Sequence, residues 1–194
     1  MIPPALERTE RRYLTVPEYE RLRRAVRHEP RDAAIVELLL QTGLGLSEVA
    51  RLRLTDIELP HRKDAAESVG SVRVWRGRQH RMVTLNSKIC EALRGYLLVR
   101  PADAGDDVVF QSKLRRGMGE RSIEDVVSKY LKAAGIWGAS VRSLRHTFAT
   151  HSVKRGTSVK VVQKVLGHAS RKTTSVYVEL AREEMDRQLQ ENAL

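Results

Sequence analysis

Three short runs of alternating or β-branched residues interrupt a chain whose apolar residues otherwise recur at helical spacing. The runs lie at 57–59, 72–75 and 82–85, and each has the length and composition of a strand in a small sheet. Helical spacing precedes and follows them, so the sheet has helices on both sides in the sequence. The pattern predicts a mainly α fold with a small antiparallel β-sheet, in the α+β class.

The segments before the sheet carry recognisable helix ends. A capping-box pattern at 15–18 predicts a first helix that runs to about residue 27. Residues 33–40 are apolar on most sides, so we expect a buried central helix that ends at Gly43. Ser47 is of a type that caps helices, and we expect it to begin the next one.

The rest of the chain returns to helical spacing after a predicted hairpin turn at 76–81. One helix is expected from Ser87 and another from Ser122. Cys90 lies in an apolar-periodic stretch, so we expect a buried side chain rather than a metal ligand or a nucleophile. Three short helical patterns close the chain, at 142–154, 158–166 and 182–191.

The charge of the chain points to a polyanionic partner. Lysine and arginine number 35 against 24 aspartates and glutamates, which gives a formal net charge of +11. The alternative is that these charges merely solvate helix faces. No apolar run approaches the roughly 20 residues of a membrane span, and the N-terminus lacks the apolar core of a secretory signal, so a cytoplasmic location without a membrane partner is expected.

The length suits one compact domain. Residues 1–12 mix prolines with charges and are expected to be a flexible arm or the remnant of a linker. The domain proper is expected to span 13–194, with a polar C-terminal tail at 179–194.

Several motifs follow one another in the last third of the chain. Leu144-Arg145-His146-Thr147-Phe148-Ala149-Thr150-His151 is followed by Val165-Leu166-Gly167-His168 and then by Thr173-Thr174-Ser175-Val176-Tyr177. This order and spacing resemble the C-terminal signature of tyrosine recombinases of the phage-integrase type. The resemblance extends upstream to Thr42-Gly43-Leu44 with Ser47-Glu48 and to the hairpin at 73–85, so it covers nearly the whole chain.

The resemblance implies phosphoryl transfer to DNA without a metal ion, a nucleotide or another cofactor. In this family a tyrosine attacks a DNA phosphate, forms a 3′-phosphotyrosyl bond and releases a 5′-hydroxyl that later re-attacks. Negative charge gathers on the non-bridging oxygens, so the site needs fixed cations or hydrogen-bond donors and an acid for the leaving oxygen.

Matches to the family's motifs assign three catalytic roles. Tyr177 is the expected nucleophile, although the same residue could be a tyrosine of an amphipathic core. Arg145 supplies a permanently charged fork for phosphate, against the alternative of an ordinary surface arginine. His168 takes the place of the family's phosphate-binding histidine or tryptophan. His146 and His151 are expected to be structural or supporting residues.

Three positions depart from the family's pattern. Gly45 stands where the first catalytic arginine normally follows Thr-Gly-Leu, unless it merely serves a tight turn. Arg76, or alternatively Arg78, stands in the place of the hairpin lysine that acts as general acid, and a pKa above about 12 makes arginine a poor proton donor. Arg142 replaces a histidine three residues before Arg145.

Double-stranded DNA is therefore the expected partner, with self-association on DNA towards a tetramer through the tail at 179–194. The resemblance also implies a helical core-binding domain ahead of this region, which we expect to be absent from this chain. The leading hypothesis is a recombinase catalytic domain of reduced activity. The alternatives are a degenerate DNA-binding accessory protein and, third, a type IB topoisomerase. Expected DNA contacts are Arg78, Arg81, Lys164, Arg171 and Lys172.

Overall fold

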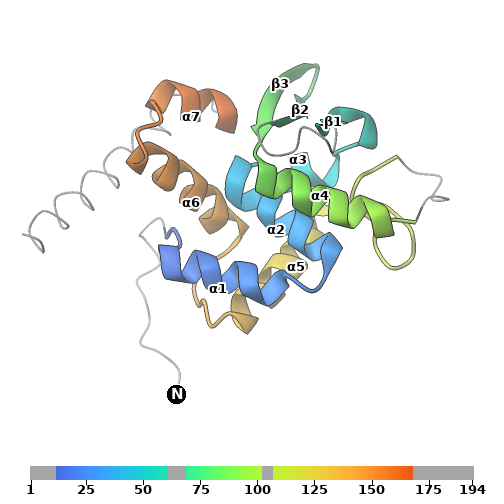
Figure 1. The fold of residues 1–194 in the computed structure, drawn as a ribbon, viewed down its shortest axis with the longest axis horizontal. Coiled ribbons are helices and arrows are strands. Elements are labelled where there is room, and N and C mark those ends of the chain that lie inside the picture. The colour runs from blue at the N-terminus through green and yellow to red at the C-terminus, as the bar shows by residue number, and fades with distance from the viewer. Residues whose placement is uncertain (1–11, 61–68, 102–106, 168–194) are drawn as a thin grey trace, which may run out of the picture.

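The computed structural model describes residues 12–60, 69–101 and 107–167. Helices dominate these residues, and a three-stranded antiparallel sheet lies between the third and fourth helices in the chain (Figure 1). The predicted α+β class is therefore confirmed. The elements are α1 (Val16–Val26), α2 (Pro30–Thr42), α3 (Leu46–Ala50), η1 (Leu54–Asp56), β1 (Ile57–Glu58), β2 (Gly70–Arg76), β3 (Gln79–Leu85), α4 (Ser87–Val99), α5 (Glu120–Ala133), α6 (Val141–Lys154) and α7 (Val159–Leu166).

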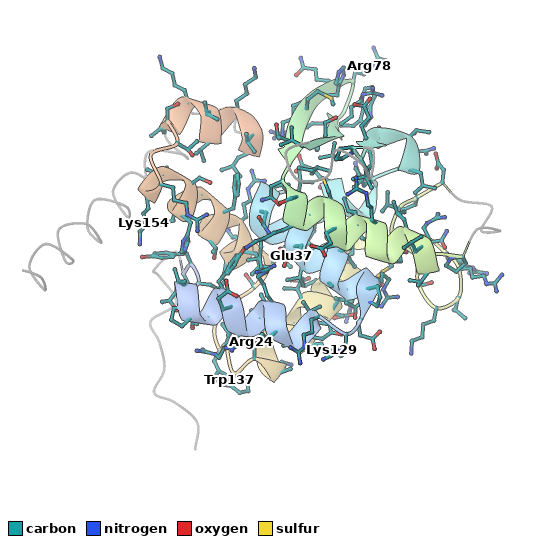
Figure 2. The ribbon with its side chains drawn as sticks, in the orientation of Figure 1. Arg24, Glu37, Arg78, Lys129, Trp137 and Lys154 are labelled. Atoms are coloured by element: carbon teal, nitrogen blue, oxygen red, sulfur yellow. The ribbon has the colours of Figure 1, made fainter. Side chains whose placement is uncertain are left out.

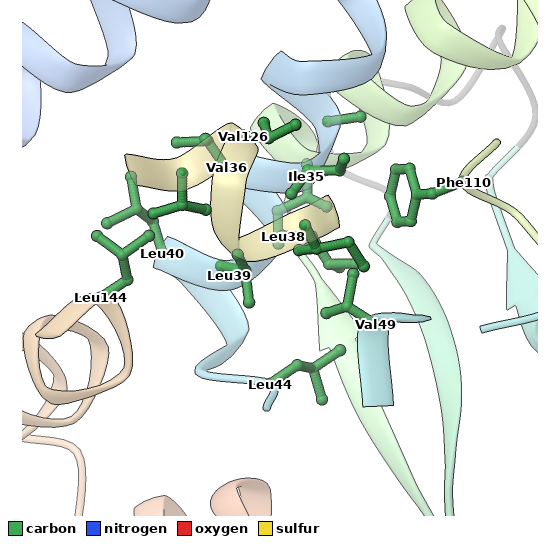
Figure 3. Packing of buried hydrophobic residues seen from close by; sticks show 14 of the residues in the cluster. Ile35, Val36, Leu38, Leu39, Leu40, Leu44, Val49, Phe110, Val126 and Leu144 are labelled. Atoms are coloured by element: carbon green, nitrogen blue, oxygen red, sulfur yellow. The ribbon is translucent and has the colours of Figure 1, made fainter. Parts of the chain in front are cut away.

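Helix α2 lies at the centre of the core, as its apolar sequence predicts. Its side chains from Ala34 to Leu40 are all buried, and they pack against residues from α3, α5 and α6 (Figure 3). The helix ends at Gly43, which has φ of +65°. A Cβ at that position would lie 2.6 Å from Leu166 and from Phe148, so only glycine lets α6 and α7 pack this closely against the turn.

The start of the domain is fastened to α6. Thr15 and Glu18 form the predicted capping box at the start of α1. The Leu14 amide donates to Thr147 Oγ1 at 2.8 Å. Arg12, the last residue of the expected arm, donates to Glu18 Oε1 at 2.6 Å and to the Trp137 carbonyl in the α5–α6 connection.

The hairpin of β2 and β3 is longer than the sequence suggested. The strands pair in register from Gly70 with Leu85 to Arg76 with Gln79, which leaves only Gly77 and Arg78 in the turn. Gly77 has φ of +62°, as two-residue hairpin turns require. The predicted turn at 76–81 is therefore wrong at both ends, because the paired strands continue through its polar residues.

Two predicted helix starts also differ. Gly45, and not Ser47, precedes α3, because the Glu48 side chain reaches back to the Gly45 amide. Gly119 precedes α5, so this helix starts before Ser122. Cys90 is buried as predicted. The helical pattern at 182–191 and most of the predicted arm fall outside the described residues.

No helix in the part of the chain that the structure describes is long and apolar enough to cross a membrane. Nor do those residues hold a group of three or more His, Cys, Asp or Glu side chains suited to a metal ion.

Candidate active site

Three arginines from three elements converge on the carboxyl end of α7, which lies at the same end of the molecule as the β2–β3 hairpin (Figure 1). The last carbonyls of a helix lack partners within it and carry the negative end of its dipole, so cations stabilise this end. The donors reach three successive carbonyls at 2.6 Å each: Arg81 Nε to residue 165, Arg145 Nη2 to residue 166 and Arg76 Nη1 to residue 167.

Arg145 joins two parts of this arrangement. Its Nη2 donates to the Leu166 carbonyl, and its Nη1 donates to the Gly43 carbonyl at 2.6 Å. The guanidinium therefore bridges the turn after α2 and the end of α7, and a hydrogen bond holds each of its two terminal nitrogens. Arg145 is half-buried and already held in place, so little free energy is needed to reorganise its side chain when an anion binds.

Glu48 holds the loop at Gly45 against the hairpin. Both of its carboxylate oxygens accept from Arg81, at 2.7 and 3.0 Å, and one also accepts from the Gly45 amide at 2.9 Å. The two side chains of the ion pair are only 14% and 13% exposed. Burial alone raises the pKa of Glu48, but the hydrogen bonds from Arg81 and Gly45 outweigh it and hold the pKa below its ordinary value.

A hollow of about 260 Å³ lies beside Gly45. Arg142 and Arg145 line it, together with one carboxylate, Glu124, so two cations face it against one anion. Gly45 has φ of −81° and ψ of 160°, an extended conformation that any residue adopts. A Cβ there would meet only Glu48 Oε2, at 3.7 Å. The turn therefore does not require glycine, and the conformational explanation for Gly45 is wrong.

The remaining predicted site residues fall into three groups. Arg78 and Lys164 are exposed, at the hairpin tip and on α7. Arg81, which is also expected to contact DNA, pairs with Glu48 and donates to the Val165 carbonyl. The predicted residues Tyr177, His168, Arg171 and Lys172 lie outside the described residues.

The two histidines that the sequence assigned to structural roles also lie on α6. His146 is buried, with 8% of its surface exposed. His151 Nε2 lies 3.0 Å from the Leu14 carbonyl, to which it donates in the tautomer that carries the proton on Nε2. His151 therefore helps to fasten the start of the domain to the helix that carries Arg145.

The sequence prediction missed the role of Glu48. A glutamate three residues after the residue that precedes a helix is the usual partner in a capping box, and Gly45 and Glu48 have that spacing. The same segment also offers Ser47 as a capping residue, so the local pattern alone favours the wrong start for α3. The pairing of Glu48 with Arg81 joins residues far apart in sequence, so no local pattern could have revealed it.

Comparison with known proteins places most of the chain in one family. The profile of the phage integrase family matches residues 12–184. A tyrosine recombinase XerD of Neisseria meningitidis is 32% identical over 187 residues, which cover 92% of this chain and 62% of that protein. A tyrosine recombinase XerC of Thermodesulfovibrio yellowstonii is 33% identical over 155 residues, which cover 76% of this chain and 49% of the relative. The chain thus spans about half to three fifths of these relatives' length.

Solved structures share the fold. The crystal structure of XerA recombinase superposes with a TM-score of 0.79 at 33% identity, over 91% of this chain and 65% of that one. XerH site-specific recombinase, in a post-cleavage complex with its palindromic difH substrate, gives a TM-score of 0.78 over 91% of this chain and 52% of that one. Its identity is 20%, so this second likeness concerns the fold alone.

Proposed function

The chain belongs to the phage integrase family of tyrosine recombinases, and from that membership we propose that it cuts and rejoins DNA strands, with Tyr177 as the nucleophile. The substrate is double-stranded DNA, and the cleaved bond is a backbone phosphodiester. Positive charge for the reaction comes from arginines rather than from a metal ion.

The observation that carries this proposal is the arginine arrangement at the end of α7. Arg145 is fixed between the Gly43 and Leu166 carbonyls, and Arg76 reaches the residue that directly precedes His168. A phosphate bound there would meet donors already in place, which is the main requirement for stabilising a phosphoryl-transfer transition state.

The proposed step exchanges one phosphodiester for another. The Tyr177 oxygen bonds to phosphorus and loses its proton, the bond from phosphorus to the 5′-oxygen breaks, and that oxygen takes up a proton. The DNA 3′ end stays attached to the tyrosine as a phosphodiester, so the reverse attack by the 5′-hydroxyl restores the strand without an outside energy source.

We also propose that this reaction is slow. Gly45 offers no charge to the hollow that Arg142 and Arg145 line, and a missing preorganised donor of this kind costs on the order of 10²–10³ in rate. Arg76 is a poor general acid, because an arginine remains protonated throughout the neutral range. Gly45 is also what favours the second candidate function, a DNA-binding accessory protein that no longer cleaves.

A nicked suicide duplex separates the two candidates. Release of a short fragment from such a substrate traps any phosphotyrosyl intermediate, which then runs as protein-bound DNA on a denaturing gel. The proposal expects a slowly accumulating adduct with the native chain and none with Tyr177→Phe. Duplex binding without an adduct at any time, in the native chain, would favour the accessory protein, and an adduct in the Tyr177→Phe variant would move the nucleophile elsewhere.

Self-association on DNA completes the proposal. A lambda integrase tetramer bound to a Holliday junction shares the fold at a TM-score of 0.62 and 17% identity. By analogy we expect this chain to be monomeric in free solution and to assemble on DNA towards a tetramer, with the tail at 179–194 as the docking segment.

A further inference from the structure

An aromatic pair on the outer face of the hairpin has no part in the proposed reaction. Trp75 of β2 and His80 of β3 are partners in the strand register, and their ring centroids lie 4.9 Å apart with the ring planes inclined at 51°. Because side chains alternate along a strand, Trp75 points away from the face on which Arg76 reaches α7. Trp75 is 49% exposed, so about half of its surface faces solvent.

The indole ring is held in one orientation by its polar edge. Trp75 Nε1 donates to Asp56 Oδ1 at 2.9 Å, and Asp56 is itself buried, with its second oxygen accepting from the Arg53 amide. The carboxylate therefore fixes the nitrogen side of the ring, and half of the tryptophan remains at the surface. A ring already immobilised loses little conformational freedom when a flat ligand stacks on it.

The charges around this pair favour an anionic ligand. Arg73 lies two residues before Trp75 on the same face of β2, and Arg78 projects from the turn next to it. Two carboxylates are also near: Asp56, which is buried and accepts from Trp75 Nε1 and the Arg53 amide, and Glu58 at the other end of the face, where the Ser71 hydroxyl donates to it. A ligand that offers a flat ring together with negative charge suits this surface, and nucleotides combine both.

We propose that Trp75 and His80 form a stacking platform for a DNA base that has left its duplex. The inference rests on the proposed function, because strand exchange requires bases near the cut to unpair. Stacking on an aromatic ring is favourable for every base, so such a platform needs no particular sequence. Trp75 is next to Arg76 in β2 but points to the other face, so the platform lies on the same hairpin as the expected phosphate site and on its opposite face.

The chain supplies its own control, because it has two tryptophans of nearly equal exposure, 49% for Trp75 and 55% for Trp137. Trp137 lies at the opposite end of the molecule from the hairpin tip at Arg78 (Figure 2). In the Trp137→Phe protein all tryptophan fluorescence comes from Trp75, and in the Trp75→Phe protein it all comes from Trp137. The Tyr177→Phe change in both backgrounds keeps the binding non-covalent.

Each protein is titrated with an intact duplex and with the same duplex carrying a short single-stranded gap. We expect the gapped DNA to quench Trp75 fluorescence more strongly than the intact duplex does, and neither DNA to change Trp137 fluorescence. Equal quenching of Trp75 by the two DNAs would mean backbone contact alone and would overturn the inference, as would no quenching. The Trp75 signal is read in the Trp137→Phe protein, so it does not depend on the folding of a variant at position 75.

Affinities give the second readout. With Trp75→Leu we expect about a tenfold loss of affinity for the gapped duplex and less than a twofold loss for the intact one, with partial recovery in Trp75→Phe and no change in Trp137→Leu. Equal losses for both DNAs would contradict the platform. Failure of the proposed function would look different, because it would appear as an absence of DNA binding or of the covalent adduct, whereas failure of this inference leaves both intact.

Discussion

Gly45 is the residue at which the proposed loss of rate can be reversed. Its extended backbone accepts any side chain, and the space around its Cβ position holds only the Glu48 carboxylate at 3.7 Å. We predict that Gly45→Arg raises the rate of adduct formation on the suicide duplex, by up to the 10²–10³ that one preorganised donor is worth, and that adding Arg76→Lys raises it further by supplying a proton donor. Gly45→Ala is the control for the side chain without the charge.

Two results would contradict this prediction. One is rapid cleavage by the unaltered chain, which would mean that another group already supplies the missing charge. Arg142 is the candidate, because it lines the same hollow as Gly45. The other is an absence of any gain in the double variant when its thermal unfolding matches that of the native chain.

Variants at Arg145 and Tyr177 should affect DNA binding and strand cleavage differently. We predict that Arg145→Ala weakens DNA binding as well as adduct formation, because it removes a fixed cation and unfastens the Gly43 and Leu166 carbonyls. Tyr177→Phe should leave the dissociation constant within about twofold and abolish the adduct, since only the hydroxyl is lost. Gel-shift and denaturing-gel assays on the same proteins measure the two effects, and weakened binding in Tyr177→Phe would argue against the assignment.

At the scale of elements, the Glu48–Arg81 pair makes α3 and the hairpin one unit. The pKa of the Glu48 carboxyl is lower in the folded protein than in an unfolded chain. Glu48 therefore stabilises the fold fully at a pH above the unfolded pKa, and this stabilisation is lost as the pH falls through the folded pKa. We predict that Glu48→Gln lowers the free energy of unfolding at pH 7 by about 1–3 kcal/mol. Urea unfolding should also show a smaller decline below pH 5 in this variant than in the native chain.

Glu20→Gln is the matched control, because Glu20 is half exposed and its contact with Arg23 is 3.8 Å long. A surface pair of this kind contributes at most about 1 kcal/mol. If the two glutamine variants lost the same stability and kept the same dependence on pH, the carboxylate of Glu48 would not fasten the loop to the hairpin.

The elements also show what a sequence can and cannot predict. The sequence correctly predicts the start of α1 from Thr15 and Glu18, and the end of α2 from Gly43. Helix caps depend on only a few neighbouring residues, so a local pattern reveals them. The hairpin turn was misjudged because polar residues continue to pair in an exposed strand. Likewise the pairing of Arg81 with Glu48 could not be predicted, because an arginine's partner is not visible in its local sequence.

In the candidate site, too, the sequence indicates some features and only the structure shows the others. Family motifs indicated Arg145 and the Gly45 substitution, and the structure adds the carbonyls that hold Arg145 and the room around Gly45. It also adds Trp75, which no motif indicated and whose neighbours Asp56 and His80 come from η1 and β3. Tyr177 and His168 stay predictions.

For the whole molecule, the net charge of +11 predicts duplex binding that depends steeply on salt. Each phosphate neutralised releases counterions, which gives a slope of about −0.9 in log affinity against log salt concentration. We predict that Lys164→Gln on α7 reduces this slope by about one, whereas Lys129→Gln on α5, at the far end from the hairpin tip, leaves it unchanged (Figure 2). Fluorescence anisotropy at several salt concentrations measures both slopes, and an affinity that does not vary with salt would exclude backbone contacts.

Assembly is the other property of the whole molecule. We predict that removing the residues after Tyr177 leaves single-protein complexes with DNA and abolishes the higher-order ones on a native gel, because the tail is the proposed docking segment. Higher-order complexes of unchanged abundance in the truncated protein would assign assembly to another surface.

The bonds that build the arginine arrangement close very long segments of chain. Arg145 and Gly43 are 102 residues apart, Arg76 and Gly167 are 91 apart, and Arg81 and Val165 are 84 apart. Contacts of such sequence separation carry a large loop-closure cost and form after local ones during folding. A newly made chain can therefore form its helices and the β2–β3 hairpin while the arginines are still far apart. Such an intermediate lacks the arginine arrangement, so the proposed strand cleavage requires the finished fold.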